Sequence, residues 1–202
     1  MLQVCTVTPD TLELLKKLQS MPELAETRLV GGTALALLLG HRLSIDLDLF
    51  GKFSQEDITE TLRSEFSDFE ILSENKIIKH YLINKVKVDL VKYDYYPWLE
   101  DVIVEDGVRL AAMKDIAAMK VAAITNRGSK KDFIDLFFLL KTFTMKEIIE
   151  LYQTKYSDAS IWMAVRSLAY FVDADEEDMP HMLIPTTWEE IKKRTTAEVK
   201  QL

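Results

Sequence analysis

The sequence predicts an α+β fold, in which a mixed sheet flanked by helices is followed by a helical lobe. In the first half, short segments alternate apolar and polar residues, as strands with one buried face do; residues 85–93 (KVKVDLVKY) are the clearest case. In the second half, apolar residues recur at helical spacing. We therefore expect an α/β core over residues 1–107 and a helical lobe packed against it over residues 108–202.

The composition is that of a folded chain from a reducing compartment. The 202 residues are 48% apolar, enough for one compact unit or two small lobes. Cys5 is the single cysteine and cannot form an intramolecular disulfide. No apolar run approaches the ~20 residues that span a bilayer, and the first ten residues lack signal-peptide features. We expect a cytoplasmic protein without a membrane partner. The net charge of −8 argues against a general nucleic-acid coat, although a local basic patch can still bind nucleic acid.

The first elements lead to a pair of glycines. Residues 10–20 have helical spacing with Asp10 as a candidate N-cap, and residues 28–30 read as a short strand. A short buried helix is expected over residues 33–40. Gly31 and Gly32 precede it and suit close approach of backbone N–H groups to a phosphate, because glycine has no Cβ and a helix N-terminus attracts anions.

The next element is an expected strand over residues 44–50 (SIDLDLF). Its polar and apolar residues alternate, so they should lie on opposite faces: Ser44, Asp46 and Asp48 on one, Ile45, Leu47 and Leu49 on the other. Two carboxylates ~6–7 Å apart repel each other, and a divalent cation such as Mg²⁺ relieves the repulsion. A solvated edge strand is the alternative. The metal site is favoured over it, because Asp is depleted in strands.

The remaining elements follow from turn and cap residues. A helix is expected over residues 55–66, opened by Ser54 and Asp57, followed by strands over 68–73, 77–83 and 85–93, an aromatic loop over 93–99, and a hairpin of 102–104 with 108–110. Asp115 is a candidate cap for a helix over residues 116–127. Further helices are expected over 131–141, 145–156, 159–170 and 187–200, with a loop over 173–185.

The Gly31–Leu35 run (GGTAL) and the Arg42-x-Ser44-x-Asp46-x-Asp48 spacing resemble the AbiEii/AbiGii-type nucleotidyltransferase toxins, within the DNA polymerase β-like superfamily. The resemblance implies a polymerase β-like sheet. It also implies a third carboxylate on a neighbouring strand, at Asp89. The implied metal ligands for Mg²⁺ or Mn²⁺ are Asp46, Asp48 and Asp89, and the implied nucleotide contacts near the glycines are Gly31, Gly32, Thr33 and Ser44.

The resemblance continues through residues 115–120 and 127–136. It implies an essential lysine at Lys120 and a catalytic aspartate at Asp132, with Asp135 as the less defined neighbour. Arg127, Lys131 and Asp135 would join Lys120 at the nucleotide. Two interpretations stay open for these charges. They either form the far wall of the nucleotide site or pair with each other and hold the lobes together.

The implied activity is metal-dependent transfer of a nucleoside monophosphate from an NTP to a hydroxyl, with release of pyrophosphate. The implied acceptor is RNA, such as a tRNA 3′ end, and the implied context is a toxin–antitoxin or abortive-infection system with an antitoxin protein. A small-molecule acceptor, or a catalytically silent binding module of the same fold, remains an alternative. A phosphatase of the haloacid type is disfavoured, because Phe50 stands where that chemistry has a hydroxyl residue.

Overall fold

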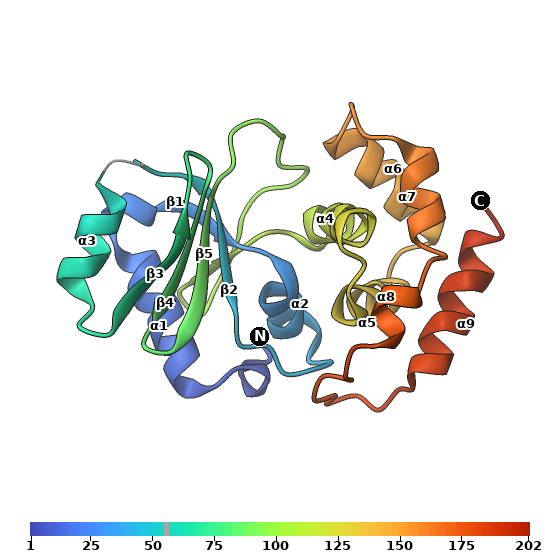
Figure 1. Ribbon diagram of the computed structural model, residues 1–202, viewed down its shortest axis with the longest axis horizontal. Coiled ribbons are helices and arrows are strands. Elements are labelled where there is room, and N and C mark those ends of the chain that lie inside the picture. The colour runs from blue at the N-terminus through green and yellow to red at the C-terminus, as the bar shows by residue number, and fades with distance from the viewer. Residues whose placement is uncertain (55–56) are drawn as a thin grey trace.

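The computed structural model describes residues 1–54 and 57–202 and consists of a sheet region and a helical region (Figure 1). In these residues the sheet has seven strands in the order β3-β4-β5-β2-β1-β7-β6. The β2–β5 and β1–β7 pairs are parallel and the other pairs antiparallel, which confirms a mixed sheet. The strands are β1 (Glu26–Leu29), β2 (Leu47–Lys52), β3 (Phe69–Glu74), β4 (Ile78–Ile83), β5 (Val86–Lys92), β6 (Ile103–Glu105) and β7 (Val108–Leu110).

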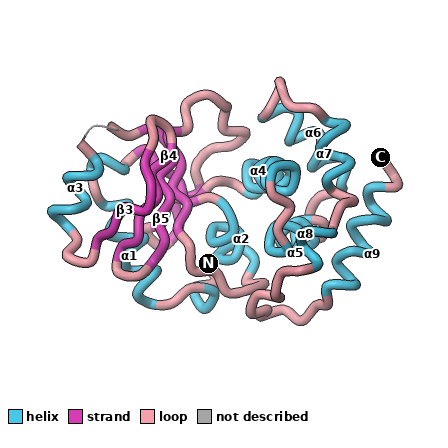
Figure 2. Tube along the Cα trace, viewed as in Figure 1, coloured by secondary structure: helices cyan, strands magenta, loops and turns pink. Residues whose placement is uncertain are grey.

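Helices cover both faces of the sheet and then form the second region (Figures 1 and 2). Helices α1 and α3 lie on one side, whereas α2 lies on the other, between the sheet and helices α4 and α5. The α-helices are α1 (Pro9–Ser20), α2 (Gly31–Leu39), α3 (Ile58–Glu65), α4 (Met113–Asn126), α5 (Lys130–Leu139), α6 (Met145–Lys155), α7 (Ile161–Ser167), α8 (Val172–Asp175) and α9 (Trp188–Val199), with 3₁₀ turns at Val4–Thr6 and Pro22–Leu24.

Most expected elements are confirmed within a few residues. The start of the expected 55–66 helix falls on residues 55–56, outside the described residues, and α3 is seen from Ile58. Helix α8 (Val172–Asp175) overlaps the start of the expected 173–185 loop. The sheet continues to Leu110, three residues past the expected end of the α/β core at residue 107. Within the described residues no helix is long and apolar enough to cross a membrane.

The strand through the aspartate motif is shorter than predicted. It begins at Leu47, so Ser44 and Asp46 precede it and the predicted alternation is wrong there. Ile45 is 60% exposed and not in the core. The cause is local hydrogen bonding, since the Ser44 N–H donates to the Thr6 carbonyl and the Thr33 hydroxyl donates to the Asp46 carbonyl. These backbone groups are therefore bonded away from the sheet.

The predicted N-caps Asp10 and Asp115 do not cap their helices. The side chain of Thr8 accepts a hydrogen bond at the start of α1, and Asp10 lies inside the first turn. Helix α4 begins at Met113, ahead of Asp115. Asp115 is fully buried, accepts backbone N–H groups of the loop before β6, and pairs with Lys155 at 2.7 Å. The carboxylate thus joins that loop to α4 and α6.

Candidate active site

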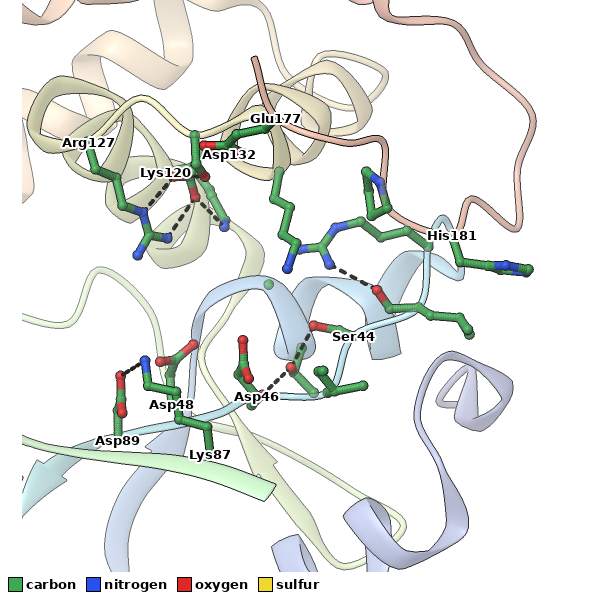
Figure 3. Close-up of a pocket in the computed structure, with 18 residues that line it drawn as sticks. Ser44, Asp46, Asp48, Lys87, Asp89, Lys120, Arg127, Asp132, Glu177 and His181 are labelled. Carbon is green, nitrogen blue, oxygen red and sulfur yellow. Dashed lines mark hydrogen bonds and ion pairs between the residues drawn. The ribbon is translucent and has the colours of Figure 1, made fainter. Parts of the chain in front are cut away.

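Three carboxylates meet where β2 and β5 lie side by side. The register of this parallel pair sets Asp48 directly beside Asp89, so their Cα atoms are on neighbouring strands about 4.8 Å apart. Asp46 lies two residues before Asp48, and all three side chains line a cleft of about 490 Å³ (Figure 3). We call Asp46, Asp48 and Asp89 the carboxylate floor. The predicted convergence of these three acids is thus present.

Ionisation of Asp48, within the carboxylate floor, is electrostatically unfavourable. Burial, followed by the nearby charge of Asp89, raises the pKa of Asp48 to about 6. Gly31 leaves space for this side chain: its φ is +69°, and a Cβ there would overlap Asp48 Oδ2. The described lining of the cleft includes Gly32 and Thr33 but not Gly31. Gly31 therefore accommodates the carboxylate, a role that the sequence did not suggest.

Asp89 has partners on both carboxylate oxygens. His80, its cross-strand neighbour on β4, places Nδ1 2.7 Å from Oδ1. Lys87, two residues earlier on β5, places Nζ 3.2 Å from Oδ2. Asp89 is 15% exposed and Lys87 is 46% exposed. His80 and Lys87 therefore each hold one oxygen of the third carboxylate.

The carboxylate floor fits a hard divalent cation by its chemistry. Carboxylate oxygens are the ligands that Mg²⁺ and Mn²⁺ prefer, and a divalent cation would relieve the crowding that raises the pKa of Asp48. Within the described residues, no three His, Cys, Asp or Glu side chains are already arranged as a ligand set. In this arrangement Asp89 Oδ2 contacts Lys87 Nζ.

Thr33 and Ser44 shape the cleft beside the carboxylate floor. Their hydroxyls are 2.8 Å apart, and Thr33 also donates to the Asp46 carbonyl. Thr33 is buried in the first turns of α2, so it fixes the segment before β2 to that helix. Ser44, Thr33 and Gly32 all line the cleft, in keeping with their predicted place at the nucleotide.

Basic residues face the carboxylate floor across the cleft (Figure 3). Lys120 on α4, Arg127 at the end of α4, and Lys131 on α5 line the cleft, and we call them the basic wall. Asp132, fully buried, accepts from Lys120 at 3.0 Å and from Arg127 Nε at 2.8 Å. Burial alone would raise the pKa of Asp132, but the Lys120 charge and the Arg127 hydrogen bond lower it to about 2.

Asp135 lies behind the basic wall and binds three cationic or polar groups. Its oxygens are 2.6 Å from Lys120 Nζ, 2.7 and 2.9 Å from Arg42 Nε and Nη2, and 2.8 Å from His41 Nε2. Burial opposes its ionisation, yet Lys120 and Arg42 hold the pKa of Asp135 well below its usual range. Gly32 leaves space here, since a Cβ would overlap Arg42 Nη2.

These charges differ in position. Asp132, Lys120, Arg127 and Lys131 line the cleft, and Asp132 pairs there with Lys120 and Arg127. Asp135 is fully buried, is not in the described lining, and connects α5 to the segment before β2.

Several residues in and behind the cleft were not predicted from the sequence. His41, behind the cleft, had no predicted partner, and Arg42, in its lining, had only a place in the motif, although both residues stand shortly before the aspartates. Residues from the expected 173–185 loop also line the cleft. The His181 carbonyl accepts from the Leu43 N–H, and the Glu177 carboxylate accepts from the Lys130 N–H. No sequence pattern predicted these contacts, because they join segments far apart in the chain.

A protein-family model described as "Nucleotidyl transferase AbiEii toxin, Type IV TA system" matches residues 13–200. The chain belongs to the AbiEii nucleotidyltransferase toxin family. An uncharacterized protein of Aquifex aeolicus is 36% identical over 197 residues, which cover 94% of each chain. The AbiEii description implies a nucleotide substrate and an antitoxin partner.

The fold of this AbiEii chain is also found among solved structures. The crystal structure of JHP933 from Helicobacter pylori matches with a TM-score of 0.58 at 19% identity, covering 96% of this chain and 92% of that one. ANT(2″)-Ia in complex with adenylyl-2″-tobramycin matches with a TM-score of 0.56 at 17% identity, covering 74% and 98%. The polymerase β-like fold is therefore confirmed, and the AbiEii chain is a nucleotidyltransferase.

Proposed function

We propose that this enzyme transfers a nucleoside monophosphate from an NTP to a hydroxyl group of an RNA, such as a tRNA 3′ end, and acts as a cytoplasmic toxin restrained by an antitoxin protein. The observation that carries the proposal is the pairing of Asp48 with Asp89 on adjacent parallel strands, opposite the basic wall. A triphosphate needs cationic groups and a bound metal ion. The basic wall on one side of the cleft and the carboxylate floor on the other support the proposal.

The proposed roles follow from the position of each group. Asp46, Asp48 and Asp89 would hold one or two Mg²⁺ ions, which when bound supply Lewis-acid stabilisation of the triphosphate. Gly32, Thr33 and Ser44 contact phosphate oxygens, and Lys120 stabilises the charge that develops on them. The acceptor oxygen forms a bond to the α-phosphorus while the bond to the β-phosphate breaks. Pyrophosphate leaves, and Asp89 accepts the hydroxyl proton.

Three exposed cations of the cleft favour an anionic acceptor. Lys87, Arg127 and Lys131 line its open side, and Arg127 is 67% exposed. These cations attract phosphate groups and repel a polycationic aminoglycoside such as tobramycin, which is the acceptor moiety in the ANT(2″)-Ia complex. An RNA acceptor therefore suits the cleft better than the small-molecule alternative, despite the net charge of −8.

The test is a transfer assay with purified protein. We expect label from one or more α-labelled NTPs to appear in total RNA in the presence of Mg²⁺, and no label on tobramycin. Asp46→Asn and Asp48→Asn should each abolish transfer while circular dichroism stays native. Labelling of tobramycin instead of RNA would replace the proposed acceptor. Transfer at the wild-type rate by either variant would contradict the roles given to the carboxylate floor.

The toxin role has a separate test in cells. Expression of the wild-type chain should slow growth, and expression of Asp48→Asn to the same level should not, because toxicity needs the transfer reaction. Equal growth of the two strains would remove the support for a toxin that acts through this cleft.

A further inference from the structure

Lys87 lines the cleft, and its contact opposes the chemistry proposed for its partner. Its ammonium lies 3.2 Å from Asp89 Oδ2 (Figure 3), while His80 on β4 places Nδ1 2.7 Å from Oδ1. An ammonium beside Oδ2 opposes the binding of a metal ion there, because two cations repel each other. Lys87 therefore weakens metal binding at Asp89 while this contact lasts.

Lys87 is the partner that can move. It is 46% exposed, whereas His80 is 32% exposed and is fixed by cross-strand pairing with Asp89. Lys87 and Asp89 lie two residues apart on β5, so both side chains lie on the cleft face of the strand. A lysine has a flexible stem and a point charge, which lets it exchange one oxygen anion for another at low cost.

Lys87 leaves Asp89 more readily when another anion takes the place of that carboxylate. The acids on the opposite side are already engaged: Asp132 accepts from Lys120 and Arg127, and Glu177 accepts from the Lys130 N–H. An acceptor strand of RNA brings phosphodiesters directly next to its reactive hydroxyl. A phosphate bound near Asp89 therefore lies close to the Lys87 ammonium.

We propose that Lys87 is a specificity-determining and positioning residue that pairs with Asp89 in the free enzyme and moves onto a phosphodiester of the RNA acceptor, which releases Asp89 for metal binding and proton acceptance. This inference rests on the proposed function of the cleft. Without RNA, the lysine competes with the metal ion for Asp89, and the bound acceptor removes this competition.

The test compares Lys87→Met with Lys92→Met. Lys92 lies on the opposite face of the same strand, outside the described lining of the cleft, and resembles Lys87 in being 41% exposed and paired with an aspartate, Asp94, at 3.2 Å. Binding of a fluorescein-labelled single-stranded RNA is measured by anisotropy in an Asp46→Asn background. Lys87→Met should weaken binding about tenfold and flatten the slope of log K against log salt by about 0.7, as expected for one lost phosphate contact. Lys87→Arg should restore both values.

A second readout concerns the metal and needs no catalysis. Without RNA, Lys87→Met in the otherwise wild-type chain should bind Mn²⁺ about threefold or more tightly than Lys92→Met, measured by electron paramagnetic resonance, because Asp89 has lost its competing cation. In the wild type, unlabelled RNA should tighten Mn²⁺ binding, and in Lys87→Met it should not. If Lys87 only stabilised the fold, its replacement would not weaken RNA binding and tighten Mn²⁺ binding at the same time.

The inference is overturned if Lys87→Met matches Lys92→Met in RNA affinity, salt slope and Mn²⁺ affinity, or if Mn²⁺ binds Lys87→Met more weakly. Failure of the proposed function looks different. In that case the wild type transfers no nucleotide to RNA and releases no pyrophosphate, while the Mn²⁺ comparison still reports on Lys87.

Discussion

Replacement of Asp135 by asparagine tests whether this one carboxylate holds the two regions of the chain together. Asp135 is fully buried, and its oxygens accept from Arg42 at 2.7 and 2.9 Å and lie 2.6 Å from Lys120. Asn keeps the shape but removes the charge, which leaves the buried Arg42 without its counter-ion. Breaking a buried ion pair in this way costs about 3–5 kcal/mol.

That cost is a large part of the stability of an ordinary domain, which is about 5–15 kcal/mol. Urea denaturation followed by circular dichroism measures it directly. Asp94→Asn is the control, because Asp94 pairs with Lys92 at the surface and its loss should cost less than about 1 kcal/mol. A change of less than about 1 kcal/mol for Asp135→Asn as well would refute the view that this carboxylate neutralises Arg42 and Lys120.

Three further predictions concern the cleft. The pKa of Asp132 is about 2, against ~3.9 in an unfolded chain, so its carboxylate adds about 2 kcal/mol to the free energy of unfolding at neutral pH. This contribution is lost as the pH falls from about 4 toward 2, and Asp132→Asn should remove this part of the acid dependence in urea denaturation. Gly31→Ala should destabilise the chain more than Gly107→Ala, since both glycines have positive φ but only Gly31 faces Asp48; equal thermal shifts would contradict this. Asp48→Asn should be at least as stable as the wild type in EDTA at about pH 7, because the buried charge is removed, and Mg²⁺ should raise the melting temperature of the wild type alone.

The pairing of Asp48 with Asp89 was predictable because it depends on local pattern. The alternation in residues 85–93 fixed the face of Asp89, and the family motif indicated neighbouring strands. The conformation of residues 44–46 was not predictable in this way. Their alternation suits a strand, but hydrogen bonds to Thr6 and Thr33, distant in sequence, keep them out of the sheet.

The buried charges show the same limit. An acid inside an apolar helix predicts a partner, and Lys120 was a correct expectation for both Asp132 and Asp135. Arg42 and His41 were not expected as partners, because only the packing of α5 against the segment before β2 brings them to Asp135. Asp115 was misassigned as a cap for a related reason: its partner Lys155 lies forty residues away.

The side-by-side placement of Asp48 and Asp89 also limits how this chain can change in length. Strand side chains alternate between faces, so one residue inserted or deleted between Val86 and Asp89 would turn the Asp89 carboxylate to the far face and shift another residue beside Asp48. The turn between β3 and β4, at residues 75–77, bears no such restriction. Active variants of this sequence can therefore gain or lose residues at that turn, whereas the segment from Val86 to Asp89 must stay four residues long.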